Sequence, residues 1–162
     1  MKTMFRLLLI ACMALPFAAC KKEAAAVAED KPLAVPADAT DDKAWKAYLA
    51  DVVGRNLGNS VGNPYVYYLT NEANPKFADD FLGQKDQVEG VVGRGVPGGS
   101  LLAFGSPASA KMAEIVESAF AGSTPDSMKG VRVLFIGQAT EKDRVQAAVA
   151  PSGAEYVFIE AK

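Results

Sequence analysis

The sequence contains no histidine and only two cysteines, Cys12 and Cys20. Without imidazole, the chain has no Ser-His-Asp or Cys-His catalysis, no histidine proton transfer, and no zinc or haem site built on histidine. Because both cysteines lie within the first 20 residues, a domain formed by the rest of the chain has no disulfide and no thiol nucleophile. Any metal ion would have to be a hard cation held by oxygen ligands. We predict no catalytic residue, no cofactor and no metal site.

Acidic residues are missing from the first 19 positions, where Lys2 and Arg6 are the only charges. An apolar run at 7–15 follows, and small residues occupy 18–19. A basic start, an apolar stretch and a small-residue cleavage region make up a secretory signal peptide. The apolar run is shorter than the roughly 20 residues that a membrane span needs. We therefore predict that residues 1–19 are a signal peptide that is removed.

The residues Phe17-Ala18-Ala19-Cys20 resemble the lipobox of bacterial lipoproteins, in which the cysteine is linked to diacylglycerol and becomes the new amino terminus. By this resemblance Cys20 is the lipidation site, and its acyl chains, palmitate among them, anchor the protein to a membrane. Residues 9–12 also fit the four-residue pattern but would leave too short an apolar segment. Ordinary cleavage near 24–26 is the alternative, and it would discard Cys20.

Lys21 is the residue that follows the lipidated cysteine. In enterobacterial lipoproteins, an aspartate at this position favours retention in the inner membrane. The resemblance therefore implies attachment to the outer membrane, facing the periplasm, in preference to the inner membrane.

The mature chain is acidic. Loss of Lys2 and Arg6 from the 17 basic residues leaves 15 against 19 acidic residues, a formal charge of −4. Affinity for nucleic acid depends chiefly on neutralising phosphates with Lys and Arg. We therefore exclude nucleic acid as a partner; the membrane and an envelope protein remain.

Residues 20–41 are rich in alanine, proline and charge and have few large apolar side chains. Such a segment cannot bury enough apolar surface to fold alone, so it predicts a tether. The remaining residues, 42–162, are of the right number for a single domain with one core.

Helix and strand patterns alternate along the domain. Apolar residues spaced by three or four predict helices over 42–56, 74–92, 106–120 and 140–150. Short apolar runs predict strands over 65–69, 100–104, 131–136 and 156–159, the last framed by Glu155 and Glu160. Residues 88–92 could instead form a strand. The strands show little alternation, which is typical of sheets covered on both faces, and each connection is long enough for a helical crossover. We predict a small three-layer α/β domain of four mostly parallel strands with an additional N-terminal helix.

Three polar residues are expected to cap helices. Asn74 and Ser106 each precede a proline, and Thr140 precedes Asp143 by three residues in the manner of a capping box.

The segment 93–98 satisfies the pattern G-x-G-x-x-G. A dinucleotide site requires a strand before this pattern and a helix after it. Here a helix precedes it and a strand follows, so we predict a turn.

Two interpretations are possible for the run Pro64-Tyr65-Val66-Tyr67-Tyr68. It could present an aromatic binding surface, or the rings could pack in the core with hydroxyls reaching the rim. We favour core packing.

Ligands of open α/β sheets bind beyond the carboxyl ends of the strands, where helix amino termini offer free N–H groups to an anion or small polar ligand. Three loops meet this description, and their candidate ligand-binding residues are Thr70, Asn71, Glu72, Gly105, Ser106, Gln138 and Thr140. A purely structural role as caps and turns is the alternative for the same residues.

These observations favour a lipid-anchored binding or interaction module without catalysis, whose partner the sequence does not name. The alternative is an envelope enzyme independent of His and Cys, or a small-anion binder, that uses the loops at the carboxyl ends of the strands.

Overall fold

A computed structural model of the chain describes residues 31–162, in which four strands form one sheet in the order β1-β2-β3-β4. The strands are β1 (Tyr65–Tyr68), β2 (Leu101–Gly105), β3 (Arg132–Gly137) and β4 (Glu155–Glu160). All three pairings are parallel. The predicted α/β class with a parallel sheet is confirmed, and β1 and β4 are its edge strands. The predicted signal peptide, Cys20 and the first part of the predicted tether lie outside the described residues.

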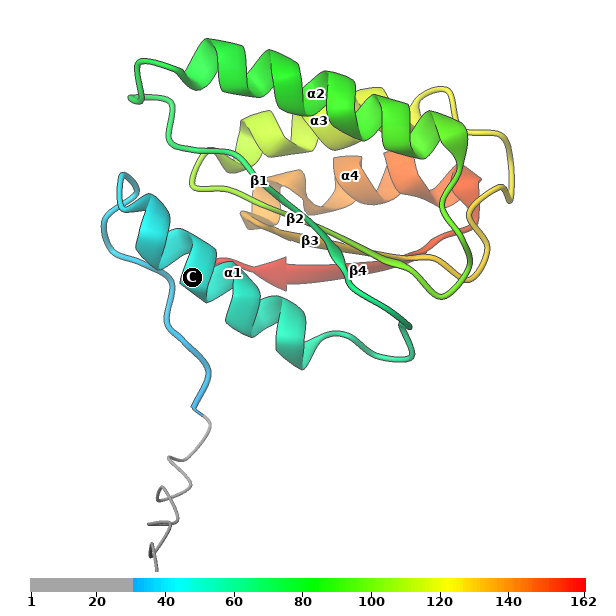
Figure 1. Cartoon of the computed structure of the whole chain (residues 1–162), viewed down its shortest axis with the longest axis horizontal. Coiled ribbons are helices and arrows are strands. Elements are labelled where there is room, and N and C mark those ends of the chain that lie inside the picture. Colours follow the sequence, from blue (N-terminus) through cyan, green and yellow to red (C-terminus); the bar gives the residue numbers. More distant parts are fainter. Residues whose placement is uncertain (1–30) are drawn as a thin grey trace, which may run out of the picture. The chain divides into compact units, whose positions relative to one another are not determined.

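Four α-helices accompany the sheet in this part of the chain. They are α1 (Asp42–Arg55), α2 (Phe77–Arg94), α3 (Ser109–Phe120) and α4 (Lys142–Val149), with short 3₁₀ turns at Ala139–Glu141 and Ala150–Ser152. Because the strands follow chain order and parallel crossovers are right-handed, α2, α3 and α4 cover the same face of the sheet. Helix α1 covers the other face, which completes three layers (Figure 1). None of the helices within 31–162 is long and apolar enough to cross a bilayer.

The sheet separates two apolar cores. The larger core lies against α2, α3 and α4 and contains Tyr67, Phe104 and Phe135, and the smaller one lies against α1 and contains Trp45 and Leu49. Among the residues that the structure describes, α1 is the only helix on its face of the sheet (Figure 1). A hollow beside β1 stays uncovered on that face.

The last residues of the predicted tether contact α1. The amide of Leu33 donates to Asp51 Oδ2 at 3.0 Å, and Val35 packs against the smaller core. The indole Nε1 of Trp45 donates to the carbonyl of Asp38 at 3.2 Å. The chain therefore reaches the first helix along a defined path.

The two proline-associated caps are wrong. Helix α2 begins at Phe77, and Asn74 Oδ1 instead accepts from the amide of Lys76 at 3.0 Å in a turn before the helix. Helix α3 begins at Ser109, and Ser106 Oγ accepts from the amide of Ala108 at 2.8 Å. Short polar side chains form such turns with the amide two residues ahead, and here that interaction displaces the cap.

The capping box expected at Thr140 and Asp143 is also wrong. The reciprocal side-chain and backbone bonds join Gln138 to Glu141, and Thr140 lies inside the 3₁₀ turn that they close. The capping box therefore lies two residues earlier in the chain than the Thr-x-x-Asp pattern suggests, and it opens the 3₁₀ turn, whereas α4 itself begins at Lys142.

The alternative strand at 88–92 is wrong, because these residues belong to α2, where Val88 and Val92 are buried. The prediction of a turn at 93–98 is confirmed: α2 ends at Arg94, and Gly95 continues with a φ of 80°, which favours glycine.

Candidate functional site

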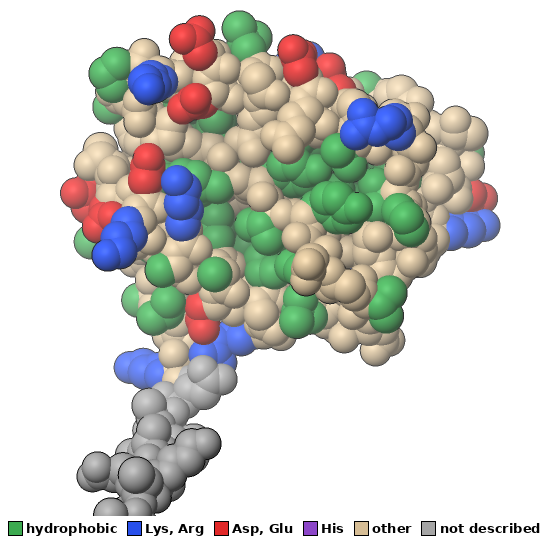
Figure 2. Space-filling view, viewed as in Figure 1, with side chains coloured by type: hydrophobic (Ala, Val, Ile, Leu, Met, Phe, Trp, Pro, Cys, Tyr) green, Lys and Arg blue, Asp and Glu red, His purple; other side chains and the backbone are tan. Residues whose placement is uncertain are grey.

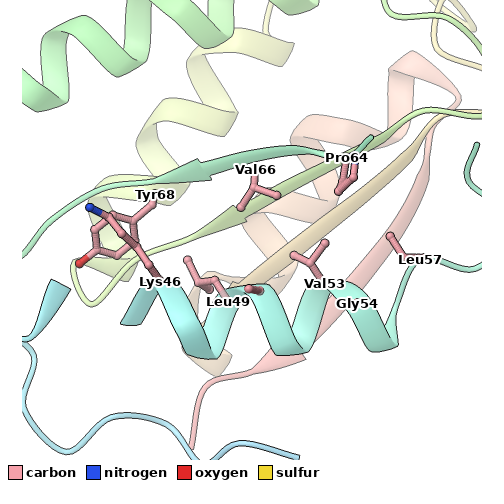
Figure 3. Close-up of a pocket in the computed structure, with 9 residues that line it drawn as sticks. Lys46, Leu49, Val53, Gly54, Leu57, Pro64, Val66 and Tyr68 are labelled. Atoms are coloured by element: carbon pink, nitrogen blue, oxygen red, sulfur yellow. The ribbon is translucent and has the colours of Figure 1, made fainter. Parts of the chain in front are cut away.

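A hollow of about 520 Å³ lies between α1 and the edge strand β1 (Figure 3). Its lining is almost wholly apolar and consists of Lys46, Leu49, Ala50, Val53, Gly54, Leu57, Pro64, Val66 and Tyr68. An open apolar hollow of this size is the usual setting of a binding site.

The helical side of the hollow is a stripe adjacent to the buried face of α1. Lys46, Ala50 and Gly54 repeat at intervals of four residues, so they lie on one side of the helix. Leu57 extends this line just past the end of α1, and all four residues are exposed. The apolar surface of α1 is thus wider than the part that the sheet covers.

The strand side of the hollow follows from the alternation of β1. Val66 and Tyr68 point towards the layer of α1, whereas Tyr67 points to the opposite face, where its ring stacks on Phe104 with centroids 5.0 Å apart. Tyr67 is buried, but Tyr65 and Val66 remain 43% and 45% exposed. Core packing therefore describes Tyr67 well, and the start of the strand lies at the surface.

A second hollow of about 510 Å³ runs along the same edge of β1 towards α2. It shares Lys46, Val66 and Tyr68 with the first hollow, so the two form one continuous depression, which we call the β1 groove. The α2 side is polar and includes Gln84 and Gln87. Three carboxylates, those of Asp42, Asp79 and Asp80, line this half against the single ammonium group of Lys46. Figure 2 shows hydrophobic side chains gathered between α1 and α2, with acidic side chains near them.

Asp42 joins α1 to the end of β1. Its Oδ1 accepts a hydrogen bond from the hydroxyl of Tyr68 at 2.7 Å and another from Thr70 Oγ1 at 2.8 Å. These two bonds, that from Tyr68 first, hold the pKa of Asp42 below its ordinary value, so the carboxylate stays charged. Burial, and next the bond to Asp42, raise the pKa of Tyr68. Lys46 Nζ lies 5.1 Å from the centre of the Tyr68 ring.

The candidate residues at the end of β1 have separate surroundings. Thr70 is buried in the Asp42 network and also receives a bond from Asn74 Nδ2 at 3.2 Å. Thr70 and Asn71 line a small hollow of about 140 Å³, and Glu72 is exposed in the next turn.

The candidates at the end of β2 have structural partners. Gly105 lies so close to α1 that an added Cβ would collide with the side chain of Leu49. Ser106 is 1% exposed, and its Oγ donates to the carbonyl of Leu69 at 2.7 Å. Both residues therefore hold the sheet ends and α1 together.

At the end of β3, the buried carboxylate of Glu141 organises the candidates. Its Oε2 accepts from Ser109 Oγ at 2.8 Å and from the amide of Gln138 at 3.0 Å, and its Oε1 accepts from Thr140 Oγ1 at 2.6 Å. Gln138 Nε2 also donates to the carbonyl of Ala161 at 3.2 Å. The seven candidates are thus spread over three sets of contacts, and a ligand site there stays a prediction. Within 31–162, no group of three or more acidic side chains is placed to hold a metal ion.

Comparisons of the chain with protein-family models, with curated proteins and with solved structures give no match.

The sequence reasoning missed the helical side of the β1 groove. The signal was an apolar stripe on α1 wider than one buried face requires, since Ala50 and Gly54 adjoin the buried face and Leu57 follows just after the helix. A wide apolar stripe indicates an exposed binding surface only when it is known that the sheet covers just one side of the helix.

Proposed function

We propose that this protein is a lipid-anchored module of the bacterial envelope that binds a partner in the β1 groove. Attachment through Cys20 comes from the resemblance of the signal segment to a lipobox, and the outer membrane facing the periplasm is the proposed location. The observation that supports binding is the α1 half of the β1 groove, an apolar hollow of about 520 Å³ that is open along an edge strand. No step of chemistry is proposed.

The composition of the groove supports binding by burial of apolar surface. Most of its α1 half consists of aliphatic side chains, and removal of such surface from water contributes about 25 cal/mol per Å² before the costs of association. The polar groups at the carboxyl ends of β2 and β3, in contrast, already have partners within the domain.

Gly54 offers a direct test of the groove. It lies on α1 in the groove, and an added Cβ there would meet no atom within 4 Å, so Gly54→Leu fills the hollow without disturbing the core. Gly93 on α2 has the same open surroundings outside the groove, so Gly93→Leu is the matched control.

The test begins with peptides selected by phage display on the mature protein. We expect Gly54→Leu to weaken the binding of selected peptides at least about tenfold, or about 1.4 kcal/mol, and Gly93→Leu to leave it unchanged, as measured by calorimetry. Equal binding of every selected peptide to wild type and Gly54→Leu would contradict the proposed function.

A further inference from the structure

The two edge strands of the sheet differ in how well they are protected from pairing with strands of other chains. Strand β4 begins with Glu155 and ends with Glu160, and these glutamates pair with Arg132 and Lys162. Strand β1 consists of Tyr-Val-Tyr-Tyr and has no charge. Charged side chains are a common means of keeping an edge strand from pairing with other chains. The edge of β4 has this protection, and the edge of β1 has none.

The outer edge of β1 has no hydrogen-bond partner within the described residues. Its ladder bonds go to β2 only, and no other described backbone group bonds to Tyr65–Tyr68. In a parallel pair, alternate residues direct both their N–H and their C=O away from the neighbour. A strand laid beside β1 therefore finds free donors and acceptors.

The β1 groove occupies the place of such a strand. It lies along this edge, with the apolar stripe of α1 on one side and the exposed face of α2 on the other. Side chains of an added strand alternate between these two sides. One set would meet Ala50, Val53 and Leu57, and the other would meet Asp79 and Asp80.

We propose that β1 accepts an extended segment of another protein as a fifth strand of the sheet, and that this segment alternates apolar residues with lysine or arginine. The inference rests on the proposed function and names the class of partner. The apolar residues would fill the α1 half of the groove, and the basic residues would face the carboxylates of the α2 half. Recognition by addition of a strand combines main-chain hydrogen bonds with alternating side-chain pockets.

Charge argues against a second copy of this chain as the occupant. The strand β1 has no basic residue to place against Asp79 and Asp80. A twofold pairing of two β1 strands would also bring the acidic sides of two grooves together, which like charges oppose.

The probe is an eight-residue peptide of alternating valine and lysine with blocked ends, titrated into the full mature protein in neutral detergent at low salt. Two isomers carry N-methyl groups, one on every valine and the other on every lysine. In a strand the amides of these two sets point to opposite edges. We expect one isomer to lose binding at least tenfold and the other to retain it.

Three further comparisons test the two sides of the groove. Gly54→Leu and the double variant Asp79→Asn/Asp80→Asn should each weaken binding at least fivefold, and a valine-glutamate peptide should not bind. The controls Gly93→Leu and Asp86→Asn should leave binding unchanged, since Asp86 is exposed on α2 outside the groove.

The outcomes separate the two proposals. Equal binding of the two N-methyl isomers would overturn strand addition. Binding of the glutamate peptide as tight as that of the lysine peptide would overturn the choice of basic residues. Either result overturns the inference and leaves the groove as a binding site. Absence of binding by the valine-lysine peptide, while display-selected peptides still lose affinity in Gly54→Leu, would have the same meaning. A dimer that Val66→Lys converts to monomer would make a second copy the occupant and overturn the inference. If neither kind of peptide is sensitive to Gly54→Leu, the proposed function fails as well.

Discussion

Asp42 connects the start of α1 to the end of the edge strand through two hydroxyl groups. Hydrogen bonds to a charged acceptor are stronger than those to a neutral one, so the network depends on ionisation of this carboxylate. The same charge adds to the acidic side of the groove, and this residue therefore links stability with the proposed recognition.

We expect Asp42→Asn to lower the free energy of unfolding by about 1 kcal/mol or less at neutral pH, because the carboxylate is only partly buried. Its pKa is lowered in the folded protein, so the stabilisation is present above the ordinary aspartate pKa of about 3.9 and is lost as the pH falls through the folded value. Urea unfolding across this range should show the two proteins converging in acid. Asp86→Asn is the control, and a difference that persists in acid would contradict the ionic explanation.

Helix α1 is the element that makes the groove. Within residues 31–162 it is the main cover of one face of the sheet, with Val35 packed beside it, and its exposed stripe continues past the part that the sheet buries. The close approach at Gly105 fixes how near α1 lies to β2, since a larger residue there would collide with Leu49. The width of the groove is therefore a consequence of how one helix is seated.

Gly54→Ala tests the conformation of α1 without filling the groove. Glycine in a helix interior is about 1 kcal/mol less favourable than alanine, which sets the upper limit for Gly54 in the last turn of α1. The site is exposed, and an added Cβ would have no atom within 4 Å. We expect the free energy of unfolding to rise by up to about 1 kcal/mol, measured by urea denaturation. Gly58 provides the contrast, because its φ of +58° and the nearby guanidinium of Arg132 make Gly58→Ala unfavourable. A loss of stability in Gly54→Ala would show that this end of α1 is not helical in solution.

At the scale of the whole molecule, the proposed anchor and the domain serve different ends. Residues 32–162 form one compact unit with its own cores. The proposed lipid on Cys20 would hold that unit near the membrane.

Cys20→Ser should move the protein from the membrane fraction to the soluble fraction, because the acyl chains would then be absent. The thermal unfolding midpoint of the domain should stay the same. Fractionation followed by immunoblotting measures the first outcome, and Cys12→Ser is the matched control, expected to remain with the membrane. Unchanged membrane partition of Cys20→Ser would refute the anchor.

The sequence by itself determined the class of the fold. Short, mostly apolar runs such as 131–136 and helices between them specify a parallel sheet covered on both faces, because local periodicity and connection length leave few other arrangements. It also determined the absence of imidazole and thiol from the domain. The starts of the helices could not be predicted from the sequence in the same way. Asn74 and Ser106 accept bonds from amides two residues ahead and do not cap the helices. Both side chains also bond to the segment after β1, at Thr70 and Leu69, and a local pattern does not show these contacts.

Only the tertiary structure decided where a binding surface lies. The strand order makes β1 an edge, and α1, the one helix described on its face of the sheet, leaves a groove beside that edge. Ala50 and Gly54 lie on α1, and Val66 lies on β1. They become parts of one site because α1 packs against β2 and β3 and leaves all three residues uncovered beside β1. Edges and uncovered faces are properties of how layers are assembled, and no local pattern in the chain encodes them.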